Sequence, residues 1–409
     1  MRQSIKQWIL CFLLPLSLFA ALSLSSCGQK KEPVVQSGFY FDTVVSITLY
    51  GESDSLSPLF EEVFALCAHY ESMLSRTAAD SDIAKINEAA GTPVSVRPET
   101  LSLLQTACSY AELTGGLVDP TVTPLVLLWG FGNTPESAPD TTPDSAADDT
   151  PASAADNTPG SAADNASSSA ADGTSASAAD NASSSAADGA VHPALGSAAN
   201  PADASSLTIP PNADALAEAC SHIDYHSIII DEQAGTVMLT DPDAAIDLGF
   251  IAKGYIADRI RDYLISQEVK SAIINLGGNV LCIGEKPDHS PYRVAVKYPF
   301  GGAEDIITTI PVRGQSVVTS GVYERFIELD GVQYHHILDP RTGYPVENGL
   351  LSVTIVTNSS TDADALSTAC FLLGLTDGMA LIESLDDTEA LFITEDYTLH
   401  YSSGLLENR

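Results

Sequence analysis

The 409-residue sequence predicts an α+β fold, because strand-like and helical segments alternate irregularly and several strands are joined as hairpins. Residues 271–276 and 351–357 are rich in aliphatic residues, whereas residues 57–74 and 98–113 repeat apolar residues at helical spacing. Asp330-Gly331, between two β-rich stretches, is typical of a two-residue hairpin turn. The sequence therefore favours mixed sheets with helices packed on them.

The expected elements follow in chain order. Runs of β-branched and aromatic residues predict strands at residues 41–50, 227–231, 271–276, 292–298, 315–320, 325–338, 351–357 and around 390–393. Apolar residues at three- and four-residue spacing predict helices at residues 57–74, 98–113, 213–219 and 251–267, a helix containing Asp364, and one at 378–385. Gly115-Gly116 would stop the second helix.

The N-terminus has the pattern of an export signal. Arg2 and Lys6 precede an apolar run over residues 8–24, which is short for a spanning helix and ends in small residues. The ending Leu-Ser-Ser-Cys resembles a bacterial lipobox, which predicts that residues 1–26 are removed and that Cys27 is lipidated. The alternatives are a plain signal peptide or an uncleaved anchor. We expect residues 27–38 to be a tether and the protein to be held by lipid on the extracytoplasmic face of the cell membrane.

Residues 134–207 have a different composition from the rest of the chain. They consist almost wholly of Ala, Ser, Asp, Thr, Pro, Gly and Asn, and an aspartate recurs every eight residues at Asp156, Asp164, Asp172, Asp180 and Asp188. Such a segment has little apolar surface to bury, so folding would not offset the conformational entropy that it loses on becoming ordered. The composition predicts a disordered insertion, and without it about three hundred residues remain, enough for one large domain or two joined ones.

The net charge excludes one class of partner. The chain has 54 acidic side chains against 18 Lys and Arg, a formal charge of −36. Binding nucleic-acid phosphates requires a basic face, so nucleic acid is not an expected partner. The same charge is repelled by anionic lipid, so we expect membrane contact through the N-terminal lipid only.

The cysteines do not predict a disulfide framework. Beyond Cys11 and Cys27 the chain has an odd number without paired spacing: Cys67, Cys108, Cys220, Cys282 and Cys370. They lie mostly among aliphatic residues, where cysteine behaves as a small buried hydrophobe.

Several polar segments interrupt the predicted elements. In residues 246–255 a strand ends and a helix begins, so backbone N–H groups and Lys253 could bind an anion; a surface lysine on a capped helix is the alternative. Gly115-Gly116 could let backbone approach a ligand, or could simply end a helix. Gly277-Gly278 could let the backbone contact a ligand, or could form a simple bulge. Ser320 could bind a phosphate, or could belong to a turn.

The stretch from His335 to Thr368 carries the most specific pattern. If a helix contains Asp364 and Thr368, their oxygens lie one turn apart on one face and suit Mg²⁺, although a helix cap and a back-bonded threonine would also explain them. His335 and His336 share a predicted strand, so at most one lines a given pocket. His222 and His226 span a helix-to-strand break and are not expected to form a metal pair.

Nine short segments, in order along the chain, resemble the ApbE family, the FAD:protein FMN transferases. The resemblance runs from about residue 39 to the C-terminus, with the insertion excluded. It is carried by Phe-Asp-Thr-Val-Val-Ser-Ile from Phe41, Met-Leu-Ser-Arg from Met73, Ser-Asp-Ile-Ala-Lys-Ile-Asn from Ser81, Trp-Gly-Phe-Gly from Trp129, Asp-Leu-Gly-Phe-Ile-Ala-Lys-Gly-Tyr from Asp247, Leu-Gly-Gly-Asn from Leu276, Thr-Ser-Gly from Thr319, His-Ile-Leu-Asp-Pro-Arg-Thr-Gly from His336 and Asp-Ala-Asp-Ala-Leu-Ser-Thr from Asp362. It implies a two-lobed catalytic unit formed by residues 39–133 and 208–409.

The resemblance also implies an activity and residue roles. The activity is Mg²⁺-dependent transfer of FMN from FAD to a threonine hydroxyl of an acceptor protein, with release of AMP. The implied metal ligands are the Phe250 carbonyl, Asp364 and Thr368, and His336 is the implied base. The implied FAD contacts are Phe41, Thr77, Leu117, Val118, Asp119, Asp247, Lys253 and Leu338. Thr77 departs from the pattern, because many members have an aromatic residue there.

Other functions remain open at this point. An FAD pyrophosphatase would use the same metal but let water attack. A flavin-binding lipoprotein would store or deliver FAD without catalysis, and a surface adhesin or spacer would not bind flavin. Release of AMP from FAD, measured with and without an acceptor, separates these possibilities.

Overall fold

An antiparallel eight-stranded sheet forms the centre of the structure. The computed structural model describes residues 32–89, 91–131, 210–302 and 304–407. The predicted signal (1–26), Cys27 and the predicted insertion (134–207) lie outside these residues. The sheet order is β1 (Pro33–Tyr40), β2 (Thr43–Tyr50), β6 (Ser271–Leu276), β7 (Asn279–Gly284), β10 (Ser316–Gly321), β13 (Leu350–Thr357), β14 (Thr388–Thr394) and β15 (Leu399–Tyr401).

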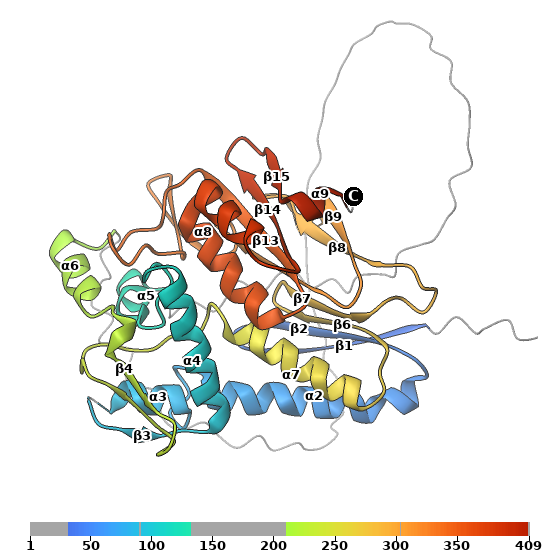
Figure 1. Ribbon diagram of the computed structural model, residues 1–409, viewed down its shortest axis with the longest axis horizontal. Helices are drawn as coiled ribbons and strands as arrows, with labels where there is room; N and C mark the ends of the chain where they lie inside the picture. The colour runs from blue at the N-terminus through green and yellow to red at the C-terminus, as the bar shows by residue number, and fades with distance from the viewer. Residues whose placement is uncertain (1–31, 90, 132–209, 303, 408–409) are drawn as a thin grey trace, which may run out of the picture. The chain divides into compact units, whose positions relative to one another are not determined.

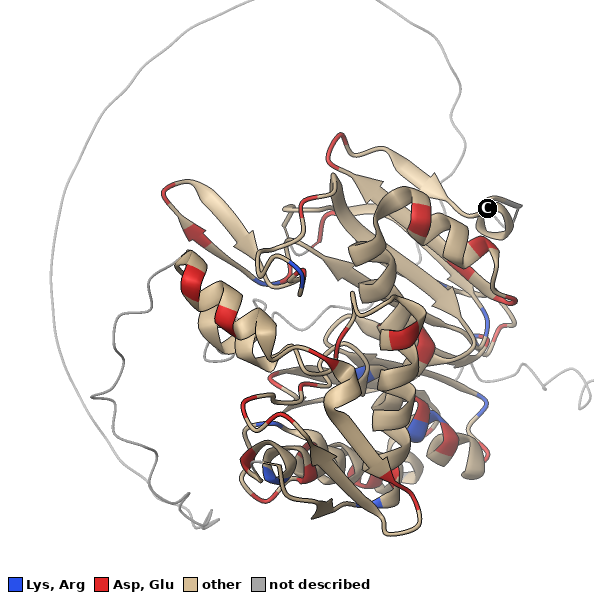
Figure 2. Ribbon diagram, turned by 60° about the vertical axis from the view of Figure 1, so that its left-hand side comes forward, with Lys and Arg blue, Asp and Glu red and all other residues tan. Residues whose placement is uncertain are grey.

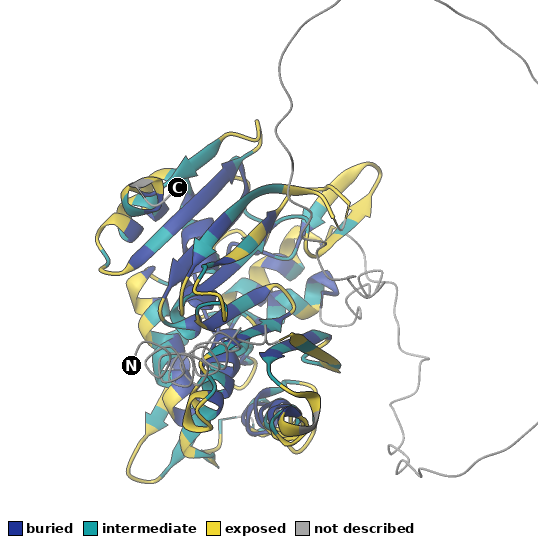
Figure 3. Cartoon of the chain, turned by 90° about the vertical axis from the view of Figure 1, so that its right-hand side faces the viewer, coloured by how far each residue is buried: buried dark blue, intermediate teal, exposed yellow. Residues whose placement is uncertain are grey.

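Three long helices cover the sheet (Figure 1). α2 (Ser53–Leu74) and α7 (Ala252–Ser266) pack together near β1 and β6, and α8 (Ser360–Glu383) packs on β10, β13 and β14. All eight residues of β13 are buried, including the polar Ser352, Thr354 and Thr357, whereas β2 buries alternate residues. Figure 3 shows the buried residues concentrated in the sheet and on the inner sides of the helices.

Smaller elements flank this core. A three-stranded sheet has the order β3 (Val94–Ser95), β5 (Thr236–Leu239) and β4 (Ile228–Asp231). Two hairpins form separate two-stranded sheets: β8 (Tyr292–Lys297) with β9 (Ile306–Val312), and β11 (Phe326–Leu329) with β12 (Val332–His335). The remaining helices are α3 (Asp82–Glu88), α4 (Pro98–Leu113), α5 (Thr123–Trp129), α6 (Ala213–Ser221), the 3₁₀ turn η2 (Tyr225–Ser227) and α9 (Ser403–Glu407).

The α+β prediction is confirmed, and two predicted elements, α4 and β6, have the predicted bounds. The predicted strand 325–338 is the β11–β12 hairpin, and Asp330 and Gly331 form its turn with φ values of 51° and 79°. Gly277 and Gly278 form a similar turn between β6 and β7 rather than a bulge, since Leu276 pairs with Asn279.

Two predictions about elements are wrong. Residues 33–38 of the predicted tether belong to β1, which pairs with β2 along its whole length. Phe41 and Asp42 are not in a strand but form the turn between β1 and β2, with φ values of 56° and 57°. The two predicted C-terminal helices are present as the two parts of α8, which Gly374 separates with non-helical backbone angles (φ 80°, ψ 176°).

The five cysteines of the described residues are free, and Cys67, Cys282 and Cys370 are buried, as predicted. Burial raises the pKa of these three thiols to about 12. α8 is the one described helix long and apolar enough to span a membrane by length and composition, but its buried residues pack in the core.

Candidate active site at the junction of two helices

The first part of the site is the crossing of α7 and α8. The Asp364 carboxylate is 5% exposed and accepts a hydrogen bond of 2.9 Å from the Gly254 backbone N–H. A Cβ atom at Gly254 would lie 2.7 Å from Asp364 Cβ and would clash with the Ser360 carbonyl, so only glycine lets the helices approach this closely. In this structure an N–H group of the first turn of α7 donates to the Asp364 carboxylate, and the binding of a ligand anion there stays a prediction.

A second carboxylate, that of Asp258, fixes the start of α8. It accepts hydrogen bonds from the Ser360 and Thr361 backbone N–H groups at 3.0 and 2.9 Å and from the Thr361 hydroxyl at 2.6 Å. It also pairs with Arg261 at 2.6 Å. Asp258 therefore satisfies N–H groups that the first turn of a helix cannot satisfy internally, and it holds α8 against α7.

Thr368 lies one turn after Asp364 in α8, as predicted. Its hydroxyl is 3.2 Å from the Ser320 hydroxyl, which is also 2.7 Å from the Ser367 hydroxyl. The end of β10 thus meets α8 through hydroxyl groups. Ser320 is engaged with α8 side chains in this structure, and a phosphate contact at Ser320 stays a prediction.

Oxygen donors at this junction suit a hard cation. Burial raises the pKa of Asp364, and nearby Lys253 and the N–H groups of α7 oppose that rise. A buried carboxylate one turn from a threonine hydroxyl matches the oxygen ligands of Mg²⁺, which uses few protein ligands. Phe250 packs against the same apolar cluster as Leu366. The oxygen donors of Asp364 and Thr368 suit the predicted ion, and the Phe250 carbonyl as a third ligand stays a prediction.

A second group of loops meets at Asp247. Its carboxylate pairs with Arg76 at 3.0 Å and accepts a hydrogen bond of 2.7 Å from the Gly249 N–H, while its own N–H donates to the Pro120 carbonyl at 2.8 Å. Asp247 therefore joins the segment after α2 to the segment after α4. Arg76 is the last residue of the Met-Leu-Ser-Arg motif from Met73, but the sequence assigned it no role.

The Asp119 carboxylate is occupied by hydrogen bonds from within the protein. Its buried carboxylate accepts hydrogen bonds from the Thr121 N–H and hydroxyl at 2.8 and 2.6 Å and from the Tyr225 N–H at 2.9 Å. Burial raises the pKa of Asp119, partly offset by the Thr121 hydrogen bonds. With this side chain occupied, a flavin contact at residues 117–119 would use the backbone next to Gly115-Gly116, where a Cβ atom would meet open space.

The other predicted flavin contacts have varied surroundings. Phe41 adopts a positive φ that is unusual for an aromatic residue, and its N–H donates to the Glu71 carboxylate at 2.6 Å. Thr77 is exposed, and its hydroxyl is 3.1 Å from the Ser75 hydroxyl. Val118 and Leu338 are 3% and 5% exposed and belong to apolar clusters.

His336 follows β12 directly and lies on the opposite side of the chain from His335, as predicted. His335 is buried and its Nε2 is 3.0 Å from the Val346 carbonyl, whereas the His336 ring faces Phe131 at 6.5 Å between centroids. The His336 Nδ1 atom is 3.1 Å from the Arg325 carbonyl oxygen, so Nδ1 carries the proton and donates. Nε2 is then the basic atom of the ring.

Lys253 connects the two catalytic candidates electrostatically. Desolvation lowers the pKa of His336 to about 3, with contributions from the positive charges of Arg325 and Lys253. The same Lys253 charge acts on Asp364, and its ammonium donates to the Gly249 carbonyl at 3.3 Å. The structure thus brings Lys253, His336 and Asp364, far apart in the sequence, into one region.

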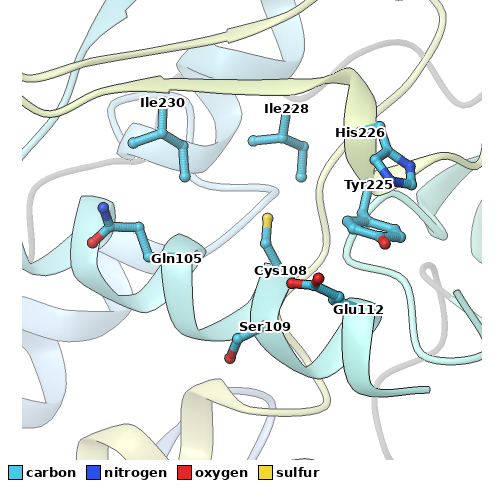
Figure 4. Close-up of a pocket in the computed structure, with 8 residues that line it drawn as sticks. All are labelled: Gln105, Cys108, Ser109, Glu112, Tyr225, His226, Ile228 and Ile230. Carbon is cyan, nitrogen blue, oxygen red and sulfur yellow. The ribbon is translucent and has the colours of Figure 1, made fainter. Parts of the chain in front are cut away.

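Two other features lie apart from this region. A depression of about 440 Å³ between α4 and β4 is lined by Gln105, Cys108, Ser109, Glu112, Tyr225, His226, Ile228 and Ile230 (Figure 4). None of these was predicted as a site residue, and burial raises the pKa of Cys108 to about 11, so its thiol is not activated. Basic residues are few compared with acidic ones (Figure 2).

His222 and His226 do not form a metal pair, in agreement with the sequence analysis. His222 pairs with Asp241 at 2.8 Å, and His226 pairs with Asp224 at 2.7 Å. His222, Asp241 and Asp243 form a possible ligand cluster, but it includes none of the site residues above.

Comparison with known proteins gives the class to which this fold belongs, a family of transferases. The profile of the ApbE family matches residues 41–156 and 162–392. A Klebsiella pneumoniae protein named FAD:protein FMN transferase is 34% identical over 360 residues, covering 88% of each chain. One of the same name from Treponema pallidum is 31% identical, covering 85% of this chain and 80% of the relative.

Solved structures agree with this classification. The ApbE protein from Thermotoga maritima has a TM-score of 0.69 at 29% identity, covering 92% of this chain and all of that one. The flavin transferase ApbE from Vibrio cholerae has a TM-score of 0.66 at 25% identity, covering 92% of this chain and 99% of that one. The chain belongs to the ApbE family, whose named relatives are transferases.

Proposed function

We propose that this protein transfers the FMN part of FAD to a threonine hydroxyl of an acceptor protein and releases AMP, with Mg²⁺ required. The observation that supports this most is the buried Asp364 carboxylate near Lys253, one helical turn from the Thr368 hydroxyl, in a chain whose relatives are named FAD:protein FMN transferases. Phe250, Asp364 and Thr368 would hold the ion. When bound, Mg²⁺ would offset negative charge on the diphosphate oxygens.

The chain's own groups supply the remaining chemistry. Lys253 places a positive charge beside the diphosphate, and Asp247 holds the loops around it. The threonine oxygen forms a bond to the FMN phosphorus, the bond from that phosphorus to the bridging oxygen breaks, and AMP leaves with that oxygen. His336 Nε2 takes the threonine proton, and the negative phosphates of bound FAD favour this by raising the pKa of the ring.

The direct test uses the full chain with FAD, MgCl₂ and candidate acceptor proteins. AMP release is followed by chromatography and added FMN by mass spectrometry of the acceptor. AMP without an acceptor would indicate a pyrophosphatase, tight FAD binding without AMP would indicate storage, and no flavin affinity would indicate a spacer or adhesin. The last two outcomes contradict the proposal.

Asp364→Ala should lower Mg²⁺-dependent turnover by at least about 100-fold, because the site loses its carboxylate ligand. Circular dichroism checks that the variant stays folded. The matched control is Asp362→Asn, two residues earlier in α8, where the carboxylate bonds to the Tyr110 hydroxyl at 2.6 Å and should not affect turnover strongly. Full activity in Asp364→Ala would reject the proposed ion site.

We also propose that Cys27 carries a lipid that anchors the protein on the extracytoplasmic face of the membrane. The support is the lipobox-like Leu-Ser-Ser-Cys sequence after an apolar run. Radiolabelled palmitate should enter the wild-type protein and not Cys27→Ser, which should leave the membrane fraction. Equal labelling of both would refute the anchor.

A further inference from the structure

We propose that the acceptor protein docks as an extended strand on the outer edge of β12, the strand that leads into His336; this inference rests on the proposed function. In the described part of the chain, β11 and β12 form a sheet of two strands only. Each strand therefore has an outer edge that no described strand covers. Such an edge presents backbone N–H and C=O groups to an incoming extended chain.

The pairing register shows which backbone groups face outward. Leu329 and Val332 flank the two-residue turn and form a hydrogen-bonded pair. From there, non-hydrogen-bonded and hydrogen-bonded pairs alternate along the two strands. The His336 N–H donates to the Arg325 carbonyl at 3.1 Å, which continues this alternation beyond the hairpin. Gln333 and His335 on β12, and Phe326 and Glu328 on β11, consequently direct their N–H and C=O groups away from the partner strand.

The β12 edge is favoured over the β11 edge because it continues toward the reactive region. Beyond β12, the Val346 N–H donates to the Ile337 carbonyl at 3.0 Å, so residue 346 already occupies the next outward position of the same edge. A segment paired at Gln333 and His335 would extend that ladder. It would run beside His336, where the proposed function requires a polypeptide hydroxyl.

Exposed apolar side chains around the hairpin are consistent with a protein partner. Phe300, Phe326, Leu329, Val332 and Tyr344 are each 38–51% exposed. Ring contacts join several of them, from Tyr323 through Phe300 to Phe326 and from Tyr344 through Trp129 to Tyr334. Aromatic residues are enriched at protein interfaces, so this surface suits a partner with alternating apolar side chains.

The charged residues around the hairpin indicate which charge the docked segment should carry. Residues 323–347 contain five acidic residues, Glu324, Glu328, Asp330, Asp339 and Glu347, against Arg325 and Arg341. Arg341 pairs with Asp339 at 2.7 Å. The hairpin region is therefore acidic overall, whereas the charges that act on His336 itself are those of Arg325 and Lys253. We expect the docked segment to carry lysine or arginine where it lies along the hairpin.

The first test uses a fluorescein-labelled peptide of about twelve residues with alternating valines, one central threonine and a lysine at each end. Its binding to the full chain is measured by anisotropy, together with two versions N-methylated on alternate amides. Strand pairing uses only one set of amides, so one methylated version should lose binding and the other should keep it. Equal behaviour of the two versions, or no binding of the parent peptide, would overturn the proposal.

The second test compares the two edges. Gln333→Pro removes an outward N–H from β12, and Glu328→Pro removes one from β11 at the opposite position of the register. Gln333→Pro should weaken peptide binding and FMN transfer by about tenfold or more, and Glu328→Pro by less than about twofold. Quenching of FAD fluorescence checks that both variants still bind flavin. Equal effects of the two substitutions would contradict a β12 edge site.

The remaining outcomes are also informative. If the peptide binds as expected but neither AMP nor FMN-modified peptide forms, the proposed function fails and the docking edge stands. If FMN transfer to an acceptor proceeds while Gln333→Pro has no effect, the docking proposal alone fails. Peptide binding that appears only after deletion of residues 134–207, or a dimer that Gln333→Pro abolishes, would assign the edge to another occupant and overturn the proposal.

Discussion

The α7–α8 junction and the β11–β12 hairpin are built in opposite ways, although both lie at the candidate site. At the junction, Gly254, Asp258 and Asp364 are buried and each makes specific contacts across the two helices. In the hairpin, Leu329 and Val332 are largely exposed and only the base packs on Trp129 through Tyr334. Fixed charges require a rigid, dry setting, whereas a surface that must receive a polypeptide has to leave backbone groups accessible.

The largest expected effect is at the helix crossing. Gly254→Val should lower the free energy of unfolding by about 3 kcal/mol or more, because the added atoms would overlap Ser360 and Asp364. Urea unfolding measures it. Gly302→Ala is the control, since a Cβ there would lie 3.4 Å from the Asp305 carboxylate, an ordinary contact. A stable Gly254→Val protein would mean that α7 and α8 can separate without cost.

The cap of α8 should come next. Asp258→Ala removes the acceptor of three hydrogen bonds and the partner of Arg261, and it should cost about 2–3 kcal/mol. The comparison variant is Asp262→Ala, whose contacts with Arg259 and Arg261 are at the surface and should contribute less than about 0.5 kcal/mol. Equal losses in urea would show that the Asp258 contacts are not the source of rigidity.

A smaller, pH-dependent effect is expected near the end of α6. Hydrogen bonding to Asp241 raises the pKa of His222, and the same contact lowers the pKa of Asp241. The His222 contribution is full below its unfolded pKa of about 6.5 and fades as pH rises through the raised value. The Asp241 contribution is lost as pH falls through its lowered pKa, below about 3.8.

His222→Gln should therefore lose about 0.5–1 kcal/mol at pH 5–6 and less at pH 9, measured by thermal unfolding. His226→Gln, at a mostly exposed pair with Asp224, provides the control and should change little at either pH. A loss that is independent of pH would mean that shape rather than charge stabilises this contact.

The smallest effect is expected at the hairpin tip. Leu329→Ser should change the free energy of unfolding by less than about 0.5 kcal/mol, because this side chain is already in solvent. Ile327→Ser, at the next position on the same face, should cost more since Ile327 packs in the cluster of Trp129 and Leu125. If Leu329→Ser were the more damaging of the two, the hairpin tip would be packed rather than open.

The sequence pattern was sufficient to predict those features whose conformation depends on residues close together in the chain. α4 begins at Pro98 and ends before Gly115-Gly116, and the turn at Asp330-Gly331 needed only the residues that tolerate positive φ. Asp364 and Thr368 could be placed together because one helical turn fixes their spacing. His335 and His336 were correctly assigned to opposite sides by the alternation of an extended chain.

Other features, such as strand β1 and the partners of the buried carboxylates, depend on tertiary contacts and could not be predicted from the sequence pattern. β1 has mostly exposed residues and no apolar alternation, and it becomes a strand because β2 supplies its hydrogen-bond partners. Asp247 and Asp119 resemble each other as carboxylates before turns, yet one pairs with Arg76 and the other is enclosed by Thr121 and Tyr225. Arg76 belongs to the motif from Met73, but the sequence could not identify its partner, because Asp247 lies far along the chain.

By itself, the sequence determined the class of fold, the family and the spacing of the proposed metal ligands, since these depend on short-range periodicity and on ordered motifs. Only the tertiary structure decided that the Asp364 carboxylate meets the start of α7, that Lys253 acts on both Asp364 and His336, and that β12 keeps an open edge. Electrostatic interactions and strand pairing depend on distance in space, and residues 110 apart in the chain, such as Gly254 and Asp364, become neighbours only when the chain folds.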